Sequence, residues 1–200
     1  MAKVLHIFAH PGQGTSRVNL ALWKAAQSVD GITGVDLYAV YPRYDIDIDV
    51  EQQRLLDHDV IVLQFPLFWY SCPALVKEWI DLTFEHGFAY GQDGDCLKGK
   101  HLMLALTTGG PHGAYSQQGY QHFELRTFLT PFEQTARLCQ MGFPAPYVQF
   151  DALAADGADH ARGFTALLTA LRDDTFDFRR AGEAELLTHD TLPLKEGARP

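Results

Sequence analysis

The chain has 200 residues and a formal net charge of −9, with 46% hydrophobic and 20% charged residues. This length and balance are typical of one globular domain that buries a core without disulfide bonds. The acidic charge argues against a nucleic-acid partner and against direct binding to an anionic membrane surface.

Cysteine usage and hydropathy indicate the compartment. The three cysteines are scattered and lack the spacing of a zinc site, which suits a reducing environment. The chain opens directly into an apolar strand pattern without the basic and apolar segments of a signal peptide. No apolar run approaches the ~18 residues of a membrane span. We therefore expect a cytoplasmic protein.

The N-terminal stretch combines a strand, a loop and a helix. The apolar run 4–9 predicts a buried strand, the Pro and Gly residues of 11–14 predict a turn, and apolar residues at helical spacing predict a helix over 18–29. A helix that begins after such a loop points unpaired backbone N–H groups at an anion. Thr15 and Ser16 stand at its expected start, where their hydroxyls can cap the helix or donate to a phosphate.

Two nucleotide-binding motifs are excluded by this loop. A P-loop requires a Lys that the loop lacks, and a dinucleotide fingerprint requires a third Gly where Arg17 stands. A loop that carries hydroxyl groups, amide groups and His10 fits a flavin phosphate better. The alternative is that His10 and Asn19 only satisfy the hydrogen bonds of the turn.

Strand patterns recur along the rest of the chain. Further strands are predicted over 35–39, 60–65, 101–108 and 147–150. The run 60–65 is apolar at nearly every position, which is typical of a strand covered on both faces. Strands that alternate with helices predict an α/β fold with a parallel sheet and helices on both faces.

Helix start signals lie between these strands. Asp49, with Gln52 three residues later, predicts a helix that ends near Asp57. The alternating Ile and Asp residues before it favour a solvated edge over a metal site, because the Gly and closing Glu of a calcium loop are missing. Pro73 stands at the first position of the next helix, which extends to Phe84.

The C-terminal part has two further helix patterns. Thr130 and Glu133 form a capping box for a helix that reaches about Met141 and stops at Gly142. A final helix is predicted over residues 159–172. Residues 1–173 are therefore expected to form the domain, and the weak pattern of 174–200 predicts an extension that is an arm on a neighbour or partly disordered.

Unusual loops follow three of the predicted strands. The loop 10–19 offers phosphate donors, the loop 66–71 offers aromatic surface, and the loop 107–115 offers small residues and backbone N–H groups. The aromatic residues would cover a planar ligand, meet a partner subunit or fold back into the core. The carboxyl ends of parallel strands lie at one edge of the sheet, so we expect the loops to enclose one ligand there.

Several motifs in order resemble those of a known family. They are Ala9-His10-Pro11, Ser16 to Asn19, Trp69-Tyr70-Ser71, Glu85-His86-Gly87 with Tyr90-Gly91, Gly99-Lys100, and Thr107-Thr108-Gly109-Gly110. Over residues 3–172 the chain resembles the flavodoxin-like NAD(P)H:quinone oxidoreductases, and in particular the ancillary flavoproteins of bacterial glutathione-regulated potassium efflux systems. The resemblance implies a five-stranded sheet in the order 2-1-3-4-5. It also implies a homodimer that holds FMN in each crevice, with part of each pocket contributed by the other subunit.

The resemblance also implies which residues form the site. His10 and residues 16–19 would hold the phosphate and ribityl chain, residues 67–70 one side of the isoalloxazine, and residues 107–110 its pyrimidine edge. The cofactor-binding residues are then His10, Ser16, Arg17, Val18, Asn19, Leu67, Phe68, Trp69, Tyr70, Thr107, Thr108, Gly109 and Gly110. Tyr115 matches a catalytic Tyr of the mammalian relatives, and His122 stands beside the position of their His, which is Gln121 here. No metal site is implied, and the shorter chain favours FMN over FAD.

The implied activity is a two-step hydride transfer from NAD(P)H through FMN to a quinone. A second hypothesis makes the protein a regulatory subunit of a potassium efflux transporter, held at the inner face of the membrane through that partner, with secondary redox activity. A third makes it a one-electron flavodoxin carrier, which the motif order and the loop 107–110 disfavour. Turnover with NAD(P)H and a simple quinone separates the first two hypotheses.

Overall fold

The computed structural model describes residues 1–12, 16–155 and 157–198. Its centre is a five-stranded parallel sheet in the order β2-β1-β3-β4-β5. The strands are β1 (Val4–Phe8), β2 (Ile32–Asp36), β3 (Val60–Pro66), β4 (His101–Thr107) and β5 (Tyr147–Gln149). The α/β class, the parallel pairing and the strand order confirm the predicted fold.

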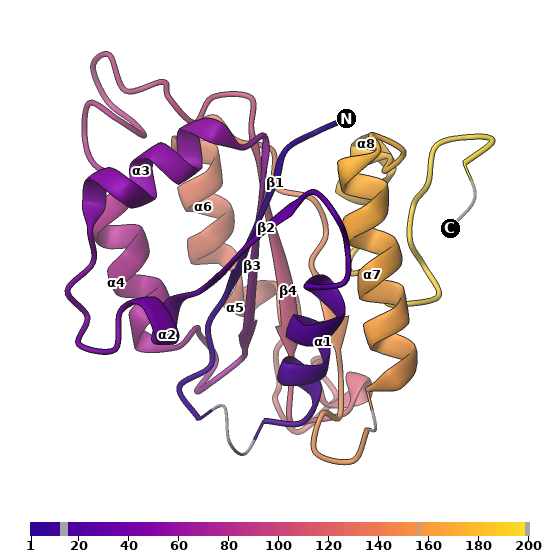
Figure 1. Ribbon diagram of the computed structural model, residues 1–200. Helices are drawn as coiled ribbons and strands as arrows, with labels where there is room; N and C mark the ends of the chain where they lie inside the picture. Colours follow the sequence, from indigo (N-terminus) through magenta and orange to yellow (C-terminus); the bar gives the residue numbers. More distant parts are fainter. Residues whose placement is uncertain (13–15, 156, 199–200) are drawn as a thin grey trace.

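Helices cover both faces of this sheet (Figure 1). One face carries α1 (Val18–Ala26), α7 (Ala158–Arg172) and α8 (Phe178–Glu183). The other carries α2 (Leu37–Val40), α3 (Ile48–Asp57), α4 (Ala74–Thr83), α5 (Leu125–Phe128) and α6 (Thr130–Leu138). Each face has its own apolar core, and β1 and β3 are buried at every position because both of their faces are covered.

The second strand lies earlier in the chain than predicted. The prediction placed it over 35–39, but β2 spans Ile32–Asp36 and pairs along the whole of β1. The Asp36 carboxylate accepts the Ala39 N–H at 3.2 Å and thereby caps helix α2, so the chain turns into a helix where the sequence pattern continued as a strand.

The cap of α3 is Asp47, not the predicted Asp49. The Asp47 carboxylate accepts the Val50 N–H at 3.1 Å, and the helix begins at Ile48. Asp49 lies in the first turn, where a negative charge still interacts favourably with the helix dipole.

The predicted capping box at the start of α6 is absent. Its N-cap is Leu129, which has near-helical dihedral angles because α5 leads directly into α6. The Thr130 hydroxyl therefore donates to the Thr127 carbonyl at 3.0 Å instead of capping the helix. Glu133 forms ion pairs with Arg126 and Arg137 instead of completing the box.

The C-terminus of α6 also differs from the prediction, which extended it to Met141 and ended it with Gly142. The helix ends at Leu138, and Gln140 adopts a left-handed conformation with φ of 56°. The Met141 N–H donates back to the Ala136 carbonyl at 2.8 Å, which is the hydrogen bond of a Schellman motif. Gly142 instead pairs with the main chain next to β4.

The C-terminal extension, in the part of it that the structure describes, packs on the chain's own domain. Phe176 and Leu187 are buried in the core on the side of α7. The main chain of Leu187 bonds to Pro146 and to Val148, each at 2.8 Å, and so lies alongside β5 at the edge of the sheet. This segment therefore covers an edge strand that would otherwise present unpaired backbone groups.

A buried carboxylate joins three helices on the opposite side. Glu51 of α3 is fully buried and accepts hydrogen bonds from the Tyr41 hydroxyl at 2.6 Å and the Trp79 indole N–H at 2.9 Å. It also pairs with Arg54. These contacts fix α3 against α4 and the end of α2. The three helices belong to the helical layer that packs on β3.

Candidate functional site

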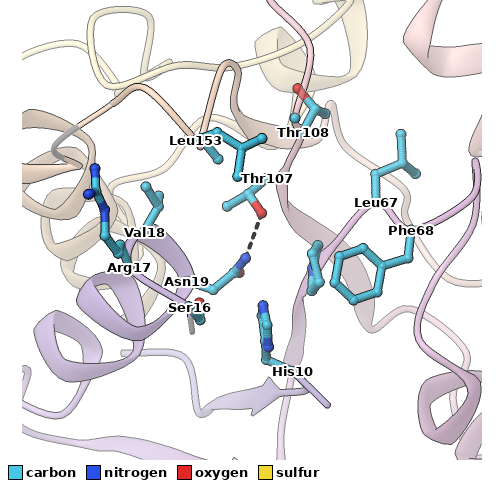
Figure 2. Close-up of a pocket in the computed structure, with 13 residues that line it drawn as sticks. His10, Ser16, Arg17, Val18, Asn19, Leu67, Phe68, Thr107, Thr108 and Leu153 are labelled. Atoms are coloured by element: carbon cyan, nitrogen blue, oxygen red, sulfur yellow. Dashed lines mark hydrogen bonds between the residues drawn. The ribbon is translucent and has the colours of Figure 1, made fainter. Parts of the chain in front are cut away.

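A cavity of about 540 Å³ opens where β1, β3 and β4 end. This volume is in the range of small-molecule and cofactor sites. Figure 2 shows Arg17 and Val18 on one side of the cavity and Leu67 and Phe68 on the opposite side. Its lining residues are His10, Ser16, Arg17, Val18, Asn19, Pro66, Leu67, Phe68, Thr107, Thr108, Gly109, Ala152 and Leu153. The three loops singled out in the sequence therefore meet at one site.

His10 follows β1 and presents a hydrogen-bond donor to the site. Its Nδ1 accepts the Gly12 backbone N–H at 3.1 Å, so the neutral ring carries its proton on Nε2. Burial lowers the pKa of His10, which keeps the ring neutral at neutral pH. The ring meets Phe68 edge-on, with ring centroids 5.7 Å apart.

The N-terminus of α1 supplies an electropositive end. Arg17 is its N-cap, and among the described residues no side chain forms a cap hydrogen bond, which leaves the first backbone N–H groups to a ligand. The Arg17 guanidinium adds a full positive charge beside them, and Ser16 adds a hydroxyl. Helix dipole, N–H groups and guanidinium together suit a phosphate. The expected contributions of Gly14 and Thr15 lie outside the described residues.

The floor of the site is a chain of buried polar side chains. His6 Nε2 lies 2.8 Å from Gln64 Oε1. The Gln64 amide donates to the Asn19 carbonyl at 2.8 Å and to Asn19 Oδ1 at 3.2 Å. The Asn19 amide donates to the Thr107 hydroxyl at 2.5 Å, the bond drawn in Figure 2. The chain joins β1, β3, α1 and β4 under the cavity.

Sequence reasoning missed His6 and Gln64. Both interrupt apolar runs that form buried strands, at 4–8 and 60–66. A polar side chain in a strand covered on both faces must find a buried partner, and this signal was available in the sequence. Asn19 was expected at the cofactor, and the structure shows its amide bonded within the protein.

The aromatic loop is divided between the cavity and solvent. Phe68 and Ser71 exchange two backbone hydrogen bonds of 3.0 Å, and Trp69 and Tyr70 between them have φ of 46° and 65°. This is the geometry of a tight type I′ turn. Phe68 lines the cavity, whereas Trp69 is 92% exposed and Tyr70 packs 5.0 Å from Phe128. Trp69 is therefore not folded back into the core, and neither Trp69 nor Tyr70 lines the cavity of the single chain.

The glycine-containing loop after β4 contributes its first residues to the cavity. A Cβ placed on Gly109 would meet no atom within 4 Å, so a ligand can approach the backbone there. The Thr108 hydroxyl donates to the Gly110 carbonyl at 2.9 Å, and the Tyr120 side chain packs close to Gly110. Gly110 is therefore occupied within the loop and does not line the cavity.

Neither of the two expected catalytic residues lines the cavity. Tyr115 is buried, and burial raises the pKa of its hydroxyl. Its ring lies 5.8 Å from Phe150 and 6.4 Å from Phe128. His122 is exposed in a turn with φ of 60°. The structure does not bring either side chain into contact with the cavity.

The wall formed by Ala152 and Leu153 was also missed. These residues follow β5, whose carboxyl end lies at the same edge of the sheet as the other loops. The Ala152 N–H donates to the Thr108 carbonyl at 2.9 Å, which joins this segment to the loop after β4. The edge rule applied to the last strand would have found them.

Within residues 1–12, 16–155 and 157–198, no three His, Cys, Asp or Glu side chains gather as a metal site. Over the same residues, every helix is too short or too polar to cross a membrane.

Comparison with known proteins identifies the family. A family model described as a flavodoxin-like fold matches residues 2–173. The chain belongs to this flavodoxin-like family. It is 45% identical over 166 residues to the glutathione-regulated potassium-efflux system ancillary protein KefG of Cronobacter sakazakii, which covers 82% of this chain and 90% of that protein. KefG of Serratia proteamaculans is 46% identical over 148 residues, 74% of this chain and 81% of that one.

Solved structures of the family agree with this assignment. General stress protein 14 of Treponema denticola, determined in complex with FMN, has a TM-score of 0.80 and 38% identity over 84% of this chain and 99% of that chain. An NADPH-quinone reductase from P. pentosaceus has a TM-score of 0.74 and 28% identity over 84% of this chain and 96% of that chain. The resemblance noted from the sequence motifs is thereby confirmed.

Proposed function

We propose that the protein is an FMN-dependent NAD(P)H:quinone oxidoreductase. The observation that carries the proposal is that the N-terminus of α1, beside Arg17, and an apolar wall at Phe68 lie at the same end of the sheet. No side chain of the described residues caps that N-terminus. This arrangement suits a ligand that has an anionic phosphate at one end and a planar apolar ring at the other. The relatives support the proposal, since one is named an NADPH-quinone reductase and another was determined with FMN.

The residues present fit FMN. Ser16, Arg17 and the first N–H groups of α1 would hold the phosphate. Leu67 and Phe68 would cover one side of the ring, and Gly109 leaves its backbone open for the polar edge. When bound, the flavin supplies the hydride chemistry between NAD(P)H and the quinone. We propose FMN over FAD because the family match extends over a short chain and the relative above binds FMN.

This chain's own groups would stabilise charge and exclude water. Backbone N–H groups at Gly109 and the neutral Nε2–H of His10 are preorganised donors for negative charge that develops on the bound group. The apolar side chains of Val18, Leu67 and Phe68 would exclude water from the bound group and lower the local dielectric, which strengthens those interactions. Tyr115 and His122 would act in catalysis only if a second copy or a bound ligand brings them to the reacting atoms.

We further propose a homodimer in which a second copy covers the aromatic rim of the cavity. The rim consists of exposed Phe68, Trp69, Tyr70, Tyr120 and Phe123. An aromatic patch of this kind is unusual on a monomer. Because Phe68 also lines the cavity, a partner that covers the patch would complete the site. Sedimentation velocity tests this: a monomer at all micromolar concentrations contradicts it.

The proposed function is tested by the cofactor first and the reaction second. Purified protein incubated with FMN should show flavin absorption, and mass analysis of the released chromophore should give FMN. The protein should then oxidise NAD(P)H with a simple quinone at about 1 per second or faster, within the range of ordinary enzymes. A preparation that stays colourless in excess FMN and FAD would contradict the proposal.

A regulatory role is the second candidate. It is favoured by the identity of 42–46% to proteins named as ancillary to a glutathione-regulated potassium-efflux system. In this role the protein would be cytoplasmic and held at the inner face of the membrane by the transporter. FMN binding with turnover well below 1 per second, together with binding to a purified transporter, would favour it over the enzyme.

A further inference from the structure

The direction of each hydrogen bond in the buried chain can be derived from one fixed point. The Asn19 backbone carbonyl can only accept, and the group 2.8 Å from it must be the Gln64 amide NH2. The Gln64 carbonyl oxygen therefore faces His6, and the His6 ring must carry its proton on Nε2 to donate to it at 2.8 Å.

The same reasoning extends toward the cavity. The second Gln64 amide proton is donated to Asn19 Oδ1, so the Asn19 NH2 group is the one that faces the Thr107 hydroxyl. Thr107 Oγ must then accept that bond, and its own proton is left to donate. Thr107 lines the cavity, and no acceptor for its proton is recorded among the residues that the structure describes.

Burial of the four side chains stabilises the direction of these hydrogen bonds. His6, Gln64, Asn19 and Thr107 are each at most 3% exposed, so water does not compete for their protons. The His6 ring packs between Trp23 and Phe164, with centroids 5.3 Å from each, and its Nδ1 has no partner among the described residues. Burial lowers the pKa of His6 to about 4, so the ring carries a single proton at neutral pH.

We infer that His6, Gln64 and Asn19 form a directed chain that commits the Thr107 hydroxyl to donate into the cavity, and that Gln64 is a positioning residue for the bound group. The bound group must present an acceptor to Thr107. The identity of that group as a flavin rests on the proposed function, whereas the direction of the chain does not.

The direction is tested without any ligand. Long-range ¹H–¹⁵N spectra of uniformly labelled protein distinguish the two neutral tautomers of a histidine. We expect His6 in the Nε2–H form, unchanged from pH 6 to pH 8. An Nδ1–H tautomer overturns the inference, because Nε2 would then be an acceptor and the Gln64 NH2 group would have to face His6 instead of Asn19. This measurement uses the unaltered protein, so it decides the matter even where a variant fails to fold.

The positioning role is tested by a double-mutant cycle with FMN as the probe. Thr107→Val removes the donor and should weaken FMN binding about three- to tenfold, the loss expected for one hydrogen bond. Thr107→Ser keeps the donor and should stay within about twofold. Gln64→Met keeps the side-chain volume and should weaken binding to a similar extent as Thr107→Val.

The decisive result is the double variant. If Gln64 acts through Thr107, Gln64→Met should have little further effect in the Thr107→Val background, whereas a general structural effect would multiply. Gln53→Met, at an exposed position of α3, is the matched control for the Gln-to-Met exchange and should bind FMN normally. Fully multiplicative losses overturn the inference. Failure of the unaltered protein to bind FMN contradicts the proposed function instead, and the His6 tautomer still decides the direction.

Discussion

Acid should destabilise the fold through two buried histidines. His6 lies in β1 and His160 in α7, and they are 0% and 3% exposed. Burial lowers the pKa of His6 from 6.5 to about 4. Burial, with the nearby His189, lowers the pKa of His160 from 6.5 to about 3. Below pH 6.5 the unfolded chain binds protons that the folded chain does not, so the free energy of unfolding falls as the pH falls.

The size of the effect follows from the pKa differences. Each pH unit between the unfolded and folded pKa values removes about 1.4 kcal/mol per histidine. At pH 5 each histidine has therefore lost about 2 kcal/mol and the pair about 4 kcal/mol, a large part of the ~5–15 kcal/mol that stabilises a typical domain. This stability is fully present above pH 6.5 and declines until the folded pKa values are reached.

Urea unfolding followed by tryptophan fluorescence at pH 7.5 and pH 5.0 measures this loss. His160→Phe keeps an aromatic ring beside Tyr147, whose ring centroid is 4.3 Å from that of His160, and removes one titrating group. Between the two pH values the variant should lose about 2 kcal/mol less than the parent, which is the contribution of His160. Equal losses in parent and variant would refute the reasoning, because the pH dependence would then come from other groups.

Three substitutions test other parts of the structure. Arg17→Ala should weaken FMN binding at least about fivefold and riboflavin binding much less, since a charge-assisted hydrogen bond to phosphate is lost; fluorescence titration measures both, and Arg43→Ala is the control at an exposed arginine. An equal loss of affinity for FMN and riboflavin would show that Arg17 does not bind the phosphate. Trp69→Ala should change the free energy of unfolding by less than about 0.5 kcal/mol, because the side chain is exposed, while weakening flavin retention and dimerisation in the assembled protein. A variant as yellow and as dimeric as the parent would remove Trp69 from the site. Glu51→Gln should cost about 3 kcal/mol in urea unfolding, because it leaves the partly buried Arg54 without its counter-charge; a loss below about 1 kcal/mol would show that the ion pair adds little to the neutral hydrogen bonds.

Much of the fold could be predicted because its signals are local. The mostly apolar runs predicted as strands at 4–9 and 60–65 form the buried strands β1 and β3, each with one polar residue inside it. The second strand was misplaced because apolar residues continue past Asp36, where the Ala39 N–H donates to the Asp36 carboxylate and the chain enters α2. The end of α6 was missed because Gln140, not a glycine, takes the left-handed position.

The candidate site could be predicted in outline and not in detail. The convergence of the loops after β1, β3 and β4 follows from the rule that parallel strands end at one edge. The partners of Gln64 do not follow, because Asn19 is 45 residues away and only the finished packing brings them together. The exposure of Trp69 depends on a positive φ that aromatic residues seldom adopt, so the sequence gives no sign of it.

The segment that covers β5 has a consequence for how the protein is divided. The family match stops at residue 173, yet Leu187 is hydrogen-bonded on both sides to the stretch that leads into β5 and shares its core. A chain truncated at residue 173 would expose the edge of β5 and the apolar residues beside α7 that this segment covers. We expect such a fragment to aggregate during expression. The family match therefore ends before the folded domain does, because residues after 173 belong to its core.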